Sequence, residues 1–176
     1  MSEQDVDIAA IWRLQQAISG QLVVAGRGQL VASPGDTPVM PHDDSVLAML
    51  ATDRASRALG IELIEHGPGR AHARMVVGED MVNGHGSAHG GFIFTLADTA
   101  FACACNSWGP VAVAAGADIV FVAAARLGDT LDAHALMRSR YGRNGIYDVT
   151  VLRAGDIIAE FRGRSHQLGD RPCGRR

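Results

Sequence analysis

The sequence predicts an α+β fold in which one long apolar helix packs against a single antiparallel sheet. The helix is predicted by the run from Gly91 to Asn106, which contains no proline and no internal glycine. At 1.5 Å per residue, this helix would be about 24 Å long. Two strand-like segments precede the run and four follow it, and a sheet that curls around one helix would bury that helix almost completely.

The long helix carries its polar residues in an inverted arrangement. On a 100° helical wheel its less apolar positions fall into one narrow wedge, and these are Gly91, Thr95, Asp98, Thr99, Ala102 and Asn106. A helix at a protein surface shows an apolar stripe on a polar body instead. We therefore expect a mostly buried helix with a small polar seam, in which the carboxylate of Asp98 must be paired, hydrogen-bonded or functional.

The remaining elements are predicted from periodicity and turn residues. A helix is expected from Ser45 to Leu59, with Ser45 as its N-cap and Gly60 as its C-terminal stop. The strand-like segments, in chain order, are Ile61–His66, Arg70–Val77, Val111–Ala123, Thr130–Tyr141, Ile146–Arg153 and Ile157–Leu168. Because the last four are joined by short links, we expect them to be antiparallel neighbours.

The composition fits one domain with a substantial core, since 47% of the 176 residues are hydrophobic. We expect this domain over residues 43–170, an N-terminal extension over residues 1–42 that is ordered or flexible and dispensable for chemistry, and a C-terminal tail over residues 171–176. The lack of a long apolar stretch and of an N-terminal signal predicts no membrane span and a cytoplasmic protein. The net charge of −3 gives no support for nucleic-acid binding.

The residue types exclude several kinds of chemistry. All 16 basic residues are arginine, which excludes a P-loop lysine, a Schiff-base lysine and a lysine general base. The 3 cysteines have no zinc-ligand or CxxC spacing, so we expect buried, reduced thiols and no metal site.

Short motifs accompany this architecture in a fixed order. Asn83-Gly84-His85 and His89-Gly90-Gly91 precede the helix, Leu96-Ala97-Asp98-Thr99 lies within it, and Gly128-Asp129-Thr130-Leu131 and Gly145-Ile146-Tyr147-Asp148 follow it. Together these motifs resemble the hotdog-fold acyl-CoA thioesterases, over residues 45–168, and within them the PaaI-type subfamily of the phenylacetate degradation pathway. The resemblance implies a hotdog thioesterase domain that hydrolyses an acyl-CoA to the free acid and CoA, with no cofactor beyond the CoA of the substrate.

The resemblance assigns roles to the helix and to the loop before it. Asp98 matches the catalytic carboxylate, and the backbone amides of Gly90 and Gly91 match the group that polarises the thioester carbonyl. Free N–H groups at a helix start favour developing negative charge, and an aspartate can either attack directly or activate a water. The sequence leaves these two roles of Asp98 open. The implied acyl group is phenylacetyl or a ring-hydroxylated relative, and a medium-chain acyl group is the alternative.

The spacing of these groups predicts an assembly. Gly90 and Asp98 are eight residues apart, about 12 Å along a helix axis, so one helix cannot easily bring both to a single carbonyl. Two antiparallel copies can, and we expect a homodimer with shared active sites. The resemblance implies that such dimers pair further into a tetramer.

Five further residues are candidates for substrate contact or for support of the site. His89 could orient the glycine loop or touch the substrate, Asn83 could contact the substrate or cap its own loop, and Thr99 could line the seam or bond back to its own helix. Arg162 and Arg164 share one face of the last strand and could meet CoA phosphates across the dimer.

Two other functions compete with thioester hydrolysis. A hotdog hydratase or dehydratase usually carries a proline-containing histidine loop, and no proline occurs between Pro68 and Pro110. A non-catalytic acyl-CoA-binding hotdog domain would not need Asp98 and would usually carry a DNA-binding segment, for which residues 1–42 offer at most one helix. Release of CoA from a bound thioester distinguishes a thioesterase from a domain that only binds acyl-CoA.

Overall fold

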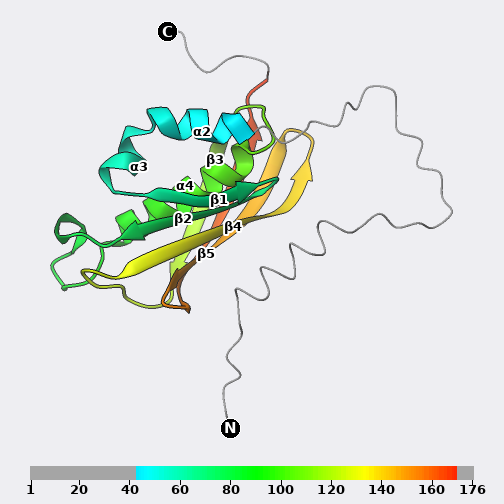
Figure 1. Ribbon diagram of the computed structural model, residues 1–176. Helices are drawn as coiled ribbons and strands as arrows, with labels where there is room; N and C mark the ends of the chain where they lie inside the picture. The colour runs from blue at the N-terminus through cyan, green and yellow to red at the C-terminus, as the bar shows by residue number, and fades with distance from the viewer. Residues whose placement is uncertain (1–42, 170–176) are drawn as a thin grey trace, which may run out of the picture. The chain divides into compact units, whose positions relative to one another are not determined.

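Six strands form one antiparallel sheet that lies against a single long helix (Figure 1). The computed structural model describes residues 43–169, so the predicted extension over residues 1–42 and the tail over residues 171–176 lie outside the described residues. The strands are β1 (Glu62–Gly67), β2 (Arg70–Val76), β3 (Ala112–Phe121), β4 (Thr130–Tyr141), β5 (Asn144–Arg153) and β6 (Asp156–Gln167). They are ordered β1-β2-β4-β5-β6-β3, and the long helix α4 (Gly90–Asn106) contacts all six. The predicted α+β architecture is confirmed.

The helix α4 is buried over most of its circumference, as its inverted polar pattern predicted. Its buried positions include Ile93, Leu96, Ala100 and Phe101, whereas Asp98 keeps partial exposure. The sheet face toward α4 is built largely from small side chains, and those without exposed surface are Ala71, Ala73, Ala133, Ala135 and Ala159. Although α4 is apolar, no helix within the described residues is long and apolar enough to cross a membrane.

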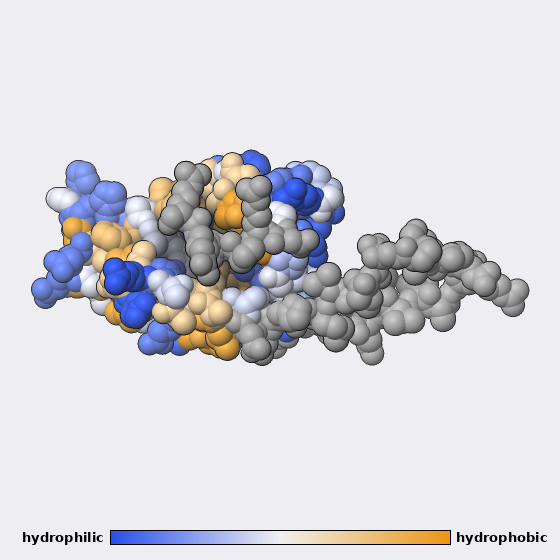
Figure 2. All heavy atoms as spheres, turned by 90° about the horizontal axis from the view of Figure 1, so that it is seen from above, coloured by the Kyte–Doolittle hydropathy of each residue, from blue (hydrophilic) through white to orange (hydrophobic). Residues whose placement is uncertain are grey.

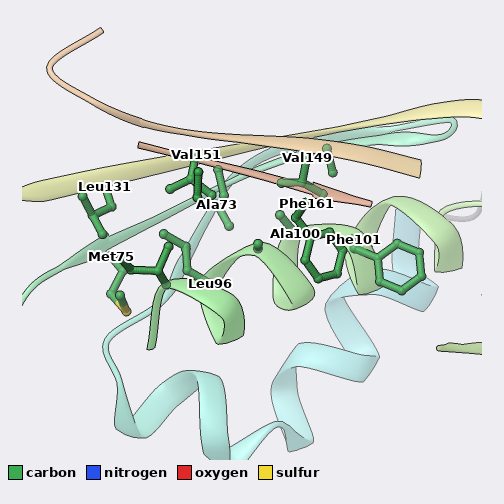
Figure 3. Packing of buried hydrophobic residues seen from close by; sticks show 14 of the residues in the cluster. Ala73, Met75, Leu96, Ala100, Phe101, Leu131, Val149, Val151 and Phe161 are labelled. Atoms are coloured by element: carbon green, nitrogen blue, oxygen red, sulfur yellow. The ribbon is translucent and has the colours of Figure 1, made fainter. Parts of the chain in front are cut away.

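The aromatic ring of Phe101 fixes how closely α4 approaches β6. A Cβ atom added at Gly163 would lie 2.7 Å from Cδ2 of this ring, so the ring occupies the space that a side chain on β6 would need. The ring centroid also lies 5.5 Å from that of Tyr147 and 5.9 Å from that of Phe161. Figure 3 shows Phe101 and Phe161 packed between the helix and the sheet. Glycine on the strand thus permits an aromatic cluster in the core.

The prediction of one continuous helix over Ser45–Leu59 is wrong. The structure has two helices there, α2 (Asp43–Thr52) and α3 (Arg54–Ala58). Asp53 stands at the break with an extended backbone, and its Oδ1 accepts a hydrogen bond of 3.0 Å from Ser56 N. Aspartate competes for backbone donors in this way and therefore favours a cap over a helix interior. Gly60, with φ of 65°, follows the second helix as the predicted stop.

Ser45 is not the predicted N-cap, because it lies inside α2. Its Oγ donates to Asn106 O at 2.9 Å and links α2 to the end of α4. The side chain of Asn106 in turn holds Ala112 at the start of β3, with hydrogen bonds of 3.0 Å from Nδ2 and 2.9 Å to Oδ1. Side chains therefore tie the C-terminal end of α4 to the elements on both sides.

The predicted pairing of the last four strands is correct for β4, β5 and β6 and wrong for β3. This strand pairs with β6 at the sheet edge instead of with β4. The link of residues 122–129 begins beside β6, where Val122 N donates a hydrogen bond to Ile158 O. It ends beside β2, where Gly128 N donates to Val77 O. A link that resembles a hairpin in sequence thus crosses the end of the sheet, and the next strand pairs with β2.

The strand β3 has an open edge. It pairs with β6 on one side, and no strand within residues 43–169 pairs with its other side. Exposed apolar side chains gather at its end, where Val120, Phe121 and Val122 keep 64%, 49% and 60% of their surface exposed. Apolar patches also lie between hydrophilic ones on the face of the molecule seen in Figure 2. Native sheets usually cover or interrupt such an edge, so β3 is a candidate interface.

Replacement of Gly163 tests the packing of α4 on β6. In Gly163→Ala the added Cβ meets the Phe101 ring, and we expect unfolding free energy to fall by about 1–3 kcal/mol, as in overpacked cores. Gly116→Ala is the matched control, because a Cβ at Gly116 in β3 has open space around it. Urea unfolding of the two variants measures the difference, and equal stability would show that Phe101 does not require a glycine here.

Candidate active site

The carboxylate of Asp98 lies on the part of α4 that the sheet does not cover. It is partly buried, and it has no hydrogen-bond or ion-pair partner among residues 43–169. Burial raises the pKa of the Asp98 carboxyl above its usual range. Of the three expectations for this carboxylate, a pair or a hydrogen bond is not found among residues 43–169. A desolvated acid without a partner favours a functional role.

The N-terminus of α4 presents one open backbone amide. The Nδ1 atom of His89 accepts a hydrogen bond of 3.0 Å from Gly91 N, which makes His89 the N-cap of the helix. The N–H of Gly90 has no acceptor among the described residues. Of the two amides predicted to polarise a carbonyl, that of Gly91 is occupied and that of Gly90 is available. His89 thus orients the start of the helix, and its contact with a substrate stays a prediction.

The loop before α4 is closed by its own side chains. Asn83 Oδ1 accepts hydrogen bonds of 2.9 Å from His85 N and 3.3 Å from Ser87 N. The backbone adds a bond of 2.8 Å from Asn83 N to Ser87 O and one of 2.8 Å from His89 N to Met81 O. Asn83 therefore caps the loop, as one of its two predicted roles required. Contact between Asn83 and a substrate stays a prediction.

Thr99 faces α3 and is buried, although it follows Asp98 in the chain. Its Oγ1 donates to Thr95 O at 2.9 Å, the predicted bond back to its own helix. Its Oγ1 also lies 2.9 Å from Ser56 Oγ, and Ser56 donates its own hydrogen to Asp53 Oδ2 at 2.5 Å. The hydroxyl hydrogen of Thr99 is therefore shared between Thr95 O and Ser56 Oγ. Burial acts to raise the pKa of Asp53, but the hydrogen bonds from Ser56 prevail and hold it below the usual range. This hydrogen-bonded chain fastens α3 beside the helix that carries Asp98.

The predicted phosphate-binding arginines lie on the other face of the sheet. Alternate residues of β6 face α4, and Arg162 and Arg164 are the exposed residues between them. Arg162 pairs with Asp148 through two contacts of 2.6 and 2.8 Å, and Arg164 lies 2.9 Å from Asp118. The structure therefore does not bring them together with Asp98 in one protomer. Their contact with CoA across a dimer stays a prediction.

The thiols of α4 are buried, as predicted. Cys103 and Cys105 are both free, and burial raises the pKa of each to about 12. They are therefore protonated and poorly nucleophilic at neutral pH. Within residues 43–169, no group of three His, Cys, Asp or Glu side chains is arranged to hold a metal ion.

Two residues that contact Gly90 and Thr99 were not predicted from the sequence. Phe121 of β3 lies against Gly90, where an added Cβ would come within 2.7 Å of its Cζ atom. Ser56 of α3 bonds to Thr99, as described above. The only available signals were an apolar residue in a strand and a polar residue in a helix. Neither pattern identifies a contact that depends on how distant segments pack.

A family model, a protein of known sequence and solved structures that are similar to this chain agree with one another. Residues 85–160 match the model of the thioesterase superfamily. The chain is 45% identical over 123 residues to the acyl-coenzyme A thioesterase PaaI of Escherichia coli (strain K12), an alignment that covers 69% of this chain and 88% of that protein. A solved structure of the E. coli PaaI protein from the phenylacetic acid degradation operon covers 72% of this chain and 92% of its own, with a TM-score of 0.70 and 43% identity. The structure of smu.793 from Streptococcus mutans UA159 bound to acetyl CoA covers 64% of this chain and 91% of its own, with a TM-score of 0.61 and 26% identity.

The variant Asp98→Asn tests the cost of the buried charge. Because the fold raises the pKa of Asp98, its protonated form adds to the free energy of unfolding at a pH below the usual aspartate pKa. This contribution is lost as the pH rises through the folded-state pKa, where the buried side chain becomes charged. We therefore expect Asp98→Asn to melt at a higher temperature than the wild type at pH 7, with a difference that shrinks below about pH 4. Asp156→Asn, at the exposed first residue of β6, is the control and should change little. A lower melting temperature for Asp98→Asn at pH 7 would contradict this account.

Proposed function

Because this chain belongs to the thioesterase superfamily, as an acyl-CoA thioesterase of the PaaI type, we propose that it hydrolyses phenylacetyl-CoA or a ring-hydroxylated relative to the free acid and CoA. The observation that carries the mechanism is the partly buried, unpartnered carboxylate of Asp98 on the helix whose N-terminus offers the open Gly90 amide. A half-desolvated carboxylate and an unused donor are the two groups that thioester hydrolysis needs.

The proposed reaction uses these two groups on opposite sides of one carbonyl. The Gly90 N–H donates to the thioester oxygen and stabilises the negative charge that develops there, assisted by the dipole of α4. The Asp98 carboxylate either takes a proton from the attacking water or attacks the carbonyl carbon itself. In the first route the tetrahedral intermediate breaks its C–S bond to give the free acid, and the proton held by Asp98 passes to the CoA thiolate. In the second route loss of the CoA thiolate leaves a mixed anhydride on Asp98; water then hydrolyses this anhydride to the free acid and restores the carboxylate, and the proton released from the water goes to the thiolate. Both routes require the ionised form of Asp98, so activity should fall as the pH drops through its raised pKa.

We propose a homodimer in which each site combines groups of two protomers. Gly90 and Asp98 lie on one helix about 12 Å apart, too far for one carbonyl to contact both. The open edge of β3 and its exposed Val120 and Val122 support β3 as the contact between copies. A two-fold axis would then bring the Gly90 amide of one protomer toward the Asp98 carboxylate of its partner, twice in the dimer.

Thiol release from a panel of aryl and straight-chain acyl-CoAs tests the activity and the acyl class. We expect aryl-acetyl thioesters to turn over fastest, and Asp98→Asn to lose at least about a hundredfold in kcat, within the range of acid–base and nucleophilic groups. Asp156→Asn should keep wild-type rates. Binding of these thioesters without thiol release would instead indicate a non-catalytic acyl-CoA-binding domain, and a preference for straight chains would indicate a medium-chain thioesterase.

Complementation between two inactive variants tests the shared site. Gly90→Pro removes the open amide with a residue that suits the first position of a helix, and the extended backbone of His89 is compatible with a following proline. Its Cβ meets the exposed Phe121 ring, so a melting curve of the variant alone first establishes that it folds. Mixed with Asp98→Asn and reassociated, it should restore roughly a quarter of wild-type activity, because half of the dimers are mixed and each has one intact site. Sites contained within single protomers would regain nothing.

A further inference from the structure

Phe121 is held at the N-terminus of α4 by the strand that carries it. It is the last residue of β3 and pairs with Ala159 of β6, which is fully buried on the side of the helix. Paired residues of neighbouring strands point to the same face, so Phe121 points toward α4 as well. The hydrogen bond of 2.8 Å from Val122 N to Ile158 O continues this pairing past the end of β3. The position of the ring is therefore set by the sheet and not by a loop.

The ring edge of Phe121 packs on the glycine whose amide is open. A Cβ added at Gly90 would lie 2.7, 3.1 and 3.2 Å from Cζ, Cε2 and Cε1 of this ring. The phenylalanine thus occupies the place of a side chain at the first position of α4. Glycine at this position leaves room both for the ring and for a ligand that approaches the N–H group.

The exposure of this ring distinguishes it from the other phenylalanines. All 5 lie within residues 43–169, and Phe121 is the one classed as exposed, at 49%. Phe101 and Phe161 are buried in the core, and Phe94 packs edge-on against Phe161 with ring centroids 5.3 Å apart. Phe121 therefore combines a fixed contact at the open amide with a large free ring surface that the core does not use.

We propose that Phe121 is a specificity-determining residue of the thioesterase, whose ring forms the wall against which the acyl group packs. This inference rests on the proposed function. A thioester whose carbonyl oxygen accepts from the Gly90 N–H places its carbonyl carbon close to the ring. Of the two groups on that carbon, the acyl group is the one that packs against the ring in this proposal. Aromatic rings gain from edge-to-face or offset contacts beyond the burial of area, so an acyl group with an aromatic ring near its carbonyl is favoured over a saturated ring of the same size.

A pair of substrates of nearly equal size isolates this effect. We would measure kcat/KM for phenylacetyl-CoA and cyclohexylacetyl-CoA with the wild type, Phe121→Leu, Phe121→Tyr and Phe94→Leu. The wild type should prefer the aromatic substrate, and Phe121→Leu should reduce that preference by about threefold to tenfold, the range of an aromatic pair. Phe121→Tyr keeps the ring and should keep the preference. Phe94→Leu loses a ring that packs on Phe161 and should leave the ratio unchanged, whatever it does to both rates.

Each outcome supports or overturns the inference. An equal loss on both substrates in Phe121→Leu would make the ring a structural support and overturn the proposal, as would an unchanged ratio. If Phe121→Leu does not fold, Phe121→Ile, which also lacks the ring and suits a strand, carries the same comparison. The absence of any wild-type preference for phenylacetyl-CoA would also overturn the inference. Failure of the wild type to release thiol from either substrate would instead refute the proposed thioesterase function. Size-exclusion chromatography of the variants separates a change of acyl preference from a change of assembly at β3.

Discussion

The close packing of α4 against a sheet face that alternates alanines and one glycine with large apolar side chains is the constraint on which the rest of the structure depends. Because Ala73, Ala133 and Gly163 present almost no side chain, the helix lies near the sheet backbone and the Phe101 ring fits on β6. The burial that results covers most of α4 and leaves one narrow face uncovered. Asp98 lies on that face, where desolvation raises its pKa although part of its side chain stays exposed.

One helix therefore carries both chemical groups of the proposed site, and the elements around it position them. The Asn83 loop and the His89 cap shape the N-terminus, and the Asp53–Ser56–Thr99 hydrogen bonds hold α3 beside the middle of the helix. The helix is rigid, so the separation of Gly90 and Asp98 cannot adjust to a substrate. The proposed mechanism therefore requires a second copy of the chain to complete the site, and the open edge of β3 is the proposed contact between the copies.

Local patterns in the sequence were sufficient for the parts of the fold that local physics determines. The inverted polar wedge predicted the burial of α4, and turn residues predicted the β4-β5-β6 meander. The motif around Asp98 predicted the acid of the proposed site, and its catalytic role stays a prediction. Features that depend on distant contacts were not predictable in this way: the crossing of residues 122–129, the pairing of Arg162 with Asp148, and the contact of Phe121 with Gly90. The break at Asp53 was local but was missed, because an aspartate inside an apolar pattern also occurs on exposed helix faces.

The N-cap of α4 also determines the tautomer of His89. Because Nδ1 accepts the hydrogen bond from Gly91 N, the neutral ring must carry its hydrogen on Nε2. The imidazole therefore presents a donor, and not a lone pair, on the side away from the helix. While the cap is intact, His89 is unsuited to abstract a proton from water, and it can instead offer an N–H to an oxygen at the mouth of the site. Of the two titratable side chains proposed for the site, the capped histidine can only donate, so the route that uses an attacking water assigns its proton to the carboxylate of Asp98.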